Sequence, residues 1–287
     1  MPGNDADLHS DLALLEAVAR EAGALAKTFF DKSNLSTWEK SENHPVSEAD
    51  IAVNELIFDR LLSARPAYGW LSEESPRDRH GGAGERTWIV DPIDGTRAFI
   101  NGDPYWCIGL GLLQAGKAIA GIVHAPILGQ SFAALKGAGA TLNGTAIQVS
   151  TRTELAGCRM IGSAQMFAHP AWPEKWPDMD LVLPKPNATL LRMCHVASGQ
   201  SDATIALAQK SDWDLAAGEI IVSEAGGLAT THLGEAFLYN RDEPAQRSLL
   251  VSGKGLHSLL VERMKHVRLP DPNWAVGRDR PTPSQEL

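Results

Sequence analysis

The stretch Trp88-Ile89-Val90-Asp91-Pro92-Ile93-Asp94-Gly95-Thr96 decides how this sequence is interpreted. Its apolar start predicts a strand that delivers Asp91, and the following proline favours a turn. The first and fourth residues of such a turn have Cα atoms within about 7 Å, so Asp91 and Asp94 can direct both carboxylates to one point. Gly95 permits backbone conformations closed to other residues, and Thr96 suits the cap of a following helix. This pattern predicts a hard-cation site beside an anion site.

Two further acidic stretches support this interpretation. Leu71–Ser75 is an apolar piece that runs into Glu73 and Glu74, and Trp213–Gly227 places Asp214 at the first turn of a predicted helix. Each stretch has a simpler explanation, since Asp-Pro-x-Asp-Gly is a common turn sequence, acidic residues end solvated strands, and aspartate caps helices. Their combination is what favours a functional site.

Taken together and in this order, the three stretches resemble the inositol monophosphatase family of lithium-sensitive, magnesium-dependent phosphatases. The resemblance runs from the first predicted helix to about residue 266. It implies an α/β (α+β) fold, a layered αβαβα sandwich with two mainly antiparallel or mixed sheets. It also implies a phosphoric monoester hydrolase in which a metal-activated water attacks phosphorus in line.

The resemblance also implies roles for individual residues. The cofactor would be two or three Mg²⁺ ions, for which Mn²⁺ can substitute, and the oxygen donors suit both ions. The implied metal ligands are Glu73, Asp91, the carbonyl of Ile93, Asp94 and Asp214. The implied phosphate-binding groups are Asp94, Asp214 and the amides of Gly95 and Thr96. The implied catalytic residues are Thr96, which orients the attacking water, Asp50, which holds the Thr96 hydroxyl, and Glu73; Lys40 and Glu74 match residues near the site.

The charge of the chain is consistent with this reading. Its 287 residues carry a formal net charge of −9, which argues against a nucleic-acid polymer or an anionic membrane as partner. Four converging carboxylates without metal would repel one another and raise each other's pKa values. Divalent cations would neutralise them and supply the positive field that binds a phosphate.

The substrate is predicted only as a small phosphorylated metabolite. The form Ser211-Asp212-Trp213-Asp214 resembles that of 3′(2′),5′-bisphosphate nucleotidases, in which a second phosphate needs positive charge, and Lys210 can supply some of it. Inositol-1-monophosphatase and histidinol-phosphate phosphatase remain alternatives, and Ser163 is a further candidate at the site entrance. A catalytically silent phosphate-binding or regulatory protein is an alternative of another class, disfavoured because every implied ligand position is acidic.

Periodicity and turn residues predict the elements around the site. Leu8–Phe30 is predicted as an amphipathic helix, and Ser47 with Asp50 resembles a capping box that opens a second helix. Short runs over residues 106–149 predict antiparallel hairpins, and short strands alternate with helices afterwards. The predicted units are an N-terminal lobe over residues 1–150 with most metal ligands, a C-terminal lobe over residues 151–270 that contributes Asp214, and a proline-rich tail over residues 271–287.

Location and assembly are also predicted. The three cysteines are far apart and odd in number, so neither a disulfide framework nor a zinc site is indicated. No signal peptide or apolar run of membrane-spanning length is evident, which favours a cytoplasmic protein. The family resemblance implies a homodimer.

Overall fold

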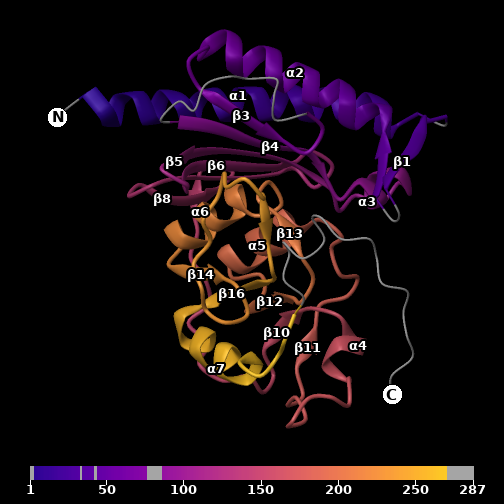
Figure 1. Cartoon of the computed structure of the whole chain (residues 1–287), viewed down its shortest axis with the longest axis vertical. Helices are drawn as coiled ribbons and strands as arrows, with labels where there is room; N and C mark the ends of the chain where they lie inside the picture. Colours follow the sequence, from indigo (N-terminus) through magenta and orange to yellow (C-terminus); the bar gives the residue numbers. More distant parts are fainter. Residues whose placement is uncertain (1–2, 33, 42–43, 76–85, 270–287) are drawn as a thin grey trace.

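The structure is a computed structural model that describes residues 3–32, 34–41, 44–75 and 86–269. Helices and sheets alternate in five layers, which confirms the predicted αβαβα sandwich (Figure 1). The helices are α1 (Gly3–Phe30), α2 (Glu48–Ala64), α3 (Thr96–Ile100), α4 (Ala164–Phe167), α5 (Thr189–Ala197), α6 (Ala216–Glu224) and α7 (Lys254–Met264). The predicted proline-rich tail lies outside the described residues.

The strands form two main sheets and two short ribbons. The first sheet contains β3 (Gly69–Ser72), β4 (Arg86–Asp94), β5 (Cys107–Gln114), β6 (Lys117–Ala125), β7 (Gln130–Leu135), β8 (Gly139–Leu142) and β9 (Thr145–Ala146). The second contains β10 (Arg159–Ile161), β11 (Asp180–Leu181), β12 (Ala203–Ala206), β14 (Gly227–Thr230) and β16 (Leu249–Gly253). The ribbons pair β1 (Thr37–Ser41) with β2 (His44–Ser47) and β13 (Lys210–Ser211) with β15 (Ala245–Gln246).

The first sheet runs in the order β3-β4-β5-β6-β7-β8-β9. β3 and β4 are parallel, and every later neighbour is antiparallel, so the predicted hairpins over residues 106–149 are confirmed. Asn143 and Gly144 join β8 to β9 with φ values of 51° and 78°. Positive φ at both central residues is the geometry of a tight hairpin turn, for which Asn-Gly is the preferred pair.

Helices α1 and α2 cover one face of this sheet. Leu15, Ala19, Ala22 and Ala26 recur at helical spacing on α1, are fully buried, and pack in the same core as Trp88. This confirms the predicted amphipathic helix, which begins at Gly3. Alternate side chains of β4 lie on opposite faces of the sheet, because successive side chains of a strand point to opposite sides.

Helices α5 and α6 lie between the two sheets (Figure 1). The contact of α6 with β6 is close, since a Cβ atom on Gly121 would lie 2.9 Å from the backbone oxygen of Ala217. The second sheet runs in the order β11-β10-β12-β16-β14, and α7 packs on β16 from the far side. No helix in the described parts of the chain has the length and apolarity needed to cross a bilayer.

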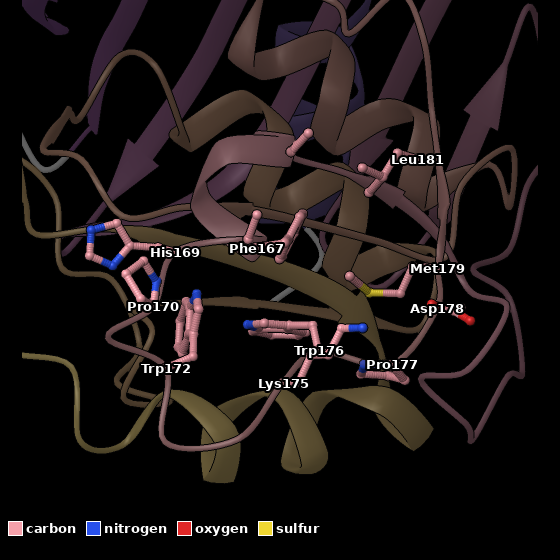
Figure 2. Close-up of a pocket in the computed structure, with 12 residues that line it drawn as sticks. Phe167, His169, Pro170, Trp172, Lys175, Trp176, Pro177, Asp178, Met179 and Leu181 are labelled. Atoms are coloured by element: carbon pink, nitrogen blue, oxygen red, sulfur yellow. The ribbon is translucent and has the colours of Figure 1, made fainter.

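An aromatic cavity of about 790 Å³ lies beside α4 and β11 (Figure 2). Phe167 and Trp172 each pack edge-on against Trp176, with ring centroids 5.0 and 5.1 Å away. Trp176 is buried, and the Arg263 guanidinium lies over its ring, with Cζ 4.7 Å from the ring centroid. These tryptophans contribute to the core of the second sheet, which is a packing role.

Candidate active site

β4 carries both aspartates of the deciding stretch, and a β-bulge brings their side chains to one face. Asp91 pairs with Gly109 and Asp94 with Cys107, so three steps along β4 match two steps along β5. Without the extra residue, positions three apart would point to opposite faces of the sheet. The predicted turn after Asp91 is therefore wrong: the strand continues to Asp94, and Pro92 lies in the bulge, where it leaves no ladder hydrogen bond unmade.

Asp91 is the most isolated carboxylate of the site. It is 1% exposed, and no described residue donates a hydrogen bond to either of its oxygens. Burial, followed by the charges of Glu73, Asp94 and Asp214, raises its pKa well above the usual value. A buried carboxylate of this kind is unfavourable unless a cation or a proton compensates it.

Asp94 joins the first sheet to α5. Its Oδ1 accepts the backbone N–H of Thr189 at 3.0 Å, and its Oδ2 accepts that of Leu190 at 2.5 Å. These are N–H groups that the first turn of a helix leaves without a partner in the helix. Burial and the charge of Asp214 raise the pKa of Asp94 to about 6, and the two amides act in the opposite direction.

Glu73 and Asp214 approach Asp91 from separate elements. Glu73 follows β3, and its backbone N–H donates to the Val90 carbonyl at 3.2 Å, which keeps it beside β4. Asp214 precedes α6, and its Oδ2 accepts the Ser211 N–H at 2.8 Å. The helix begins at Ala216, so Asp214 lies just before the first turn in which the sequence placed it. Four carboxylates from distant parts of the chain thus lie in one neighbourhood.

Asp50 connects the start of α2 to the start of α3. Its Oδ2 accepts hydrogen bonds from the backbone N–H of Ser47 at 2.8 Å and from the Ser47 hydroxyl at 2.6 Å. The bond from the backbone N–H is the one that the predicted capping box requires. Its other oxygen lies 3.2 Å from Thr96 Oγ1, which is also 3.2 Å from the Ile93 carbonyl. A hydroxyl has one proton, so these two acceptors share it or alternate.

Gly95 has a positive φ of 94° and is the N-cap of α3, a position for which the sequence suggested Thr96. Thr96 is instead the first helical residue. A Cβ atom on Gly95 would also lie 3.3 Å from the Cβ atom of Ala188, the N-cap of α5. Glycine is therefore needed both for its backbone conformation and for the close approach of α5.

The remaining predicted residues have different placements. Glu74 is half-buried in the turn after β3, beside Glu73. Lys40 lies in β1, but its side chain is outside the described part of the structure. Ser163 caps the short helix α4 by accepting the Met166 N–H at 3.4 Å, which is a local structural role. Lys210 lies in β13, next to the residue that donates to Asp214.

The donor atoms fit a hard divalent cation, because they are carboxylate and carbonyl oxygens and one carboxylate is buried without a hydrogen-bond partner among the described residues. As they stand, no three acidic, histidine or cysteine side chains among the described residues form a finished ligand set. Asp94 is turned onto α5 and Asp214 onto Ser211, so a cation would have to share these carboxylates with backbone amides. Each carboxylate oxygen has more than one lone-pair site, so sharing is chemically reasonable.

The fold and this cluster can be compared with known proteins. The sequence pattern of the inositol monophosphatase family matches residues 7–268, which is nearly the whole chain. The chain belongs to the inositol monophosphatase family. As a member of a family of phosphatases, it is a phosphoric monoester hydrolase.

Individual relatives agree with the family assignment. A histidinol-phosphatase of Chlorobaculum parvum is 32% identical over 255 residues, covering 86% of this chain and 91% of that protein. An inositol-1-monophosphatase of Caulobacter vibrioides is 31% identical over 260 residues, covering 88% and 99%. The crystal structure of the extragenic suppressor protein SuhB from Bartonella henselae superimposes with a TM-score of 0.75 at 26% identity, covering 90% and 99%.

Two basic residues of this family member were missed by sequence reasoning. Arg192 on α5 is 6% exposed. Burial lowers the pKa of its guanidinium, whereas the negative charges of Asp94 and Asp214 act to raise it. The pKa of Lys185 is lowered by partial burial and then by the charges of Arg192 and Lys210. No local motif marks either residue, because their neighbourhood forms only when distant segments of the chain come together.

Proposed function

We propose that this protein is a Mg²⁺-dependent phosphatase that hydrolyses a phosphate monoester on a small soluble metabolite. The observation that carries the proposal is the buried carboxylate of Asp91, which accepts no hydrogen bond from the part of the chain that the structure describes and lies among the charges of Glu73, Asp94 and Asp214. Such a group is stable as an anion only beside a cation, and phosphoryl transfer uses cations held in this way. Family membership supports the same reaction class.

In this proposal the metal is held by the carboxylates of Glu73, Asp91, Asp94 and Asp214 and by the Ile93 carbonyl. When bound, Mg²⁺ would neutralise these groups, activate a water for in-line attack and stabilise charge on the transferring phosphoryl group. The phosphate would rest against the amides of Gly95 and Thr96. Mn²⁺ would substitute for Mg²⁺, and Li⁺ would inhibit.

The chain supplies the positioning of the water through Asp50 and Thr96. In this arrangement the Thr96 hydroxyl would donate its proton to Asp50 Oδ1, which lies 3.2 Å away, while Ser47 fixes the other oxygen of Asp50. The lone pairs of the Thr96 hydroxyl are then available to accept a hydrogen bond that orients the attacking water, and the water must lose this proton as it attacks. Glu73 would act beside them as the acidic residue that accepts this proton.

The charge around Lys210 favours a substrate with a second phosphate, as in 3′(2′),5′-bisphosphate nucleotides. The charges of Arg192 and Lys210 both act on Lys185, and Arg192 also interacts with Asp94 and Asp214. A group of cations near the carboxylates would suit a second anionic group. This preference depends on residues of this chain, since the relatives named above are a histidinol-phosphatase, an inositol-1-monophosphatase and SuhB.

The test is phosphate release by EDTA-treated protein, with and without Mg²⁺, from adenosine 3′,5′-bisphosphate, adenosine 3′-monophosphate, myo-inositol 1-phosphate and histidinol phosphate. We expect release only with Mg²⁺ and inhibition by Li⁺. The bisphosphate should exceed the matched monophosphate in kcat/KM, and Lys210→Gln should reduce that advantage about tenfold, the equivalent of ~1.4 kcal/mol. Lys254→Gln, an exposed change on α7, is the control.

Each outcome has a separate meaning. Equal rates on the bisphosphate and the monophosphate would reject the nucleotidase preference and leave inositol phosphates or histidinol phosphate to be ranked by the same assay. Silence on every monoester would favour a phosphate-binding or regulatory protein instead of an enzyme.

A further inference from the structure

A buried asparagine on α2 joins two serines of a different element. Asn54 is 1% exposed, and its Oδ1 accepts a hydrogen bond from Ser72 Oγ at 2.7 Å. Its Nδ2 donates to Ser75 Oγ, also at 2.7 Å. Both serines are buried as well. Because each buried polar atom of this network needs its partner, the bonds favour one arrangement of the three side chains.

The two serines enclose Glu73 and Glu74. Ser72 ends β3, and Ser75 returns to it through an antiparallel bridge. Within this turn the Glu74 N–H lies 3.4 Å from Ser72 Oγ, and the Glu73 N–H donates to the neighbouring strand β4. The turn is therefore held at both ends by Asn54 and in the middle by β4. The direction in which Glu73 leaves the backbone depends on these bonds.

Only an amide satisfies both serines in this way. The amide of Asn54 presents an acceptor to Ser72 and a donor to Ser75, whereas an apolar side chain would leave both hydroxyls without this partner. Because unsatisfied buried hydroxyls are unfavourable, the short turn would rearrange to find them other partners. The bonds thus link the conformation of the turn to one residue of α2.

The position of Asn54 on its helix adds to this link. Asp50 and Asn54 are four residues apart, so they lie on the same face of α2. Asp50 contacts Thr96 at the start of α3, and Asn54 contacts the turn that carries Glu73. One face of one helix therefore sets the positions of two separate parts of the proposed site.

We infer that Asn54 is a positioning residue that, through Ser72 and Ser75, holds Glu73 in the orientation in which it binds the cation. This inference rests on the proposed function, because it assigns Glu73 as a metal ligand. Partners that orient metal ligands without contacting the metal change its affinity by roughly 10–100-fold when they are removed. The effect should therefore appear in metal dependence before it appears in the chemical step.

The test compares full-length wild type with Asn54→Ala, Ser75→Ala and the control Thr204→Val. Thr204 is a buried hydroxyl that donates to the Ile161 carbonyl at 3.0 Å in the second sheet, so its loss also removes one buried hydrogen bond. We would measure the Mg²⁺ concentration for half-maximal phosphate release, kcat at saturating Mg²⁺, Mn²⁺ binding by calorimetry, and unfolding in urea.

Asn54→Ala should raise the half-maximal Mg²⁺ concentration about tenfold or more and weaken Mn²⁺ binding by a similar factor. The kcat at saturating Mg²⁺ should fall less. Ser75→Ala should shift both metal values in the same direction by a smaller factor, since Asn54 keeps its bond to Ser72. Thr204→Val should lower stability without a change in metal dependence.

A folded Asn54→Ala protein with wild-type metal dependence would overturn the inference. If wild type released no phosphate, a weakened Mn²⁺ affinity in Asn54→Ala would still support the positioning role while rejecting the proposed function. Absence of Mn²⁺ binding by wild type would reject both. If Asn54→Ala did not fold, Ser75→Ala would decide by the same criteria.

Discussion

Asp94 Oδ2 accepts the backbone N–H of Leu190 at 2.5 Å, so a carboxylate of the first sheet caps a helix of the next layer. The same carboxylate lies beside the charges of Asp91 and Asp214. The cluster of acidic residues is thus built across the interface between two layers, and the hydrogen bonds from the start of α5 to Asp94 contribute directly to its geometry.

The substitution Asp94→Asn should keep the fold but reduce turnover by several orders of magnitude, because it removes the charge of a proposed metal ligand. The amide can replace only one of the two acceptor oxygens that face α5, so a loss of stability of about 1–3 kcal/mol is expected. Circular dichroism and phosphate release would check both results. Asp59→Asn, an exposed change on α2, is the control, and near-normal turnover in Asp94→Asn would contradict the assigned role.

Thr96→Ala and Thr96→Ser separate the hydroxyl from the backbone of α3. Alanine removes the group that bonds to Asp50, and turnover should fall by about 10²–10⁴-fold, the range of a positioned proton-transfer group. Serine keeps the hydroxyl and should retain most of the activity. Equal activity in the two variants would show that the hydroxyl has no part in the reaction.

Asp91→Asn should make the metal-free protein more stable at pH 8 while abolishing its activity. The substitution removes the buried carboxyl group of Asp91, whose pKa is raised by burial and by neighbouring carboxylates. It therefore removes a charge that is unfavourable in the metal-free protein. In wild type, Mg²⁺ at about 100 times its Kd should add ~2.7 kcal/mol of stability, and in Asp91→Asn the gain should be much smaller. Urea unfolding with EDTA or Mg²⁺ measures both, and an equal gain in the two proteins would exclude Asp91 as a ligand.

Glu219 on α6 predicts a pH dependence of stability away from the acidic cluster. Burial raises its pKa to about 7, although the charge of Lys117 opposes the shift. A carboxyl group with a raised pKa binds a proton more tightly in the folded state, so its contribution favours folding at low pH. That contribution is lost as the pH rises from about 4.5, the unfolded value, through 7.

Glu219→Gln should therefore be more stable than wild type at pH 8, by up to about 3 kcal/mol, and nearly equal to it at pH 4.5. Urea unfolding at both pH values tests this prediction, with the exposed change Glu243→Gln as control. A difference between wild type and Glu219→Gln that does not vary with pH would contradict it.

The elements that the sequence predicted well are those with a local cause. The apolar spacing of α1, the Asn143–Gly144 hairpin and the capping residues of α2 each depend on neighbours within a few positions. Asp91 and Asp94 were recognised as a pair for the same reason, although the sequence attributed their convergence to a turn. The bulge that brings them together depends on the register with β5, which no local pattern records.

By itself, the sequence determined the order of the elements, the acidic residues and the family, because periodicity, turn chemistry and motif order are properties of short segments. Only the tertiary structure decided that Asn54 reaches the Glu73 turn, that Arg192 lies beside the carboxylates and that α5 is capped by Asp94. Burial, charge interaction and hydrogen bonding between distant segments arise when the layers pack, so they depend on the whole chain.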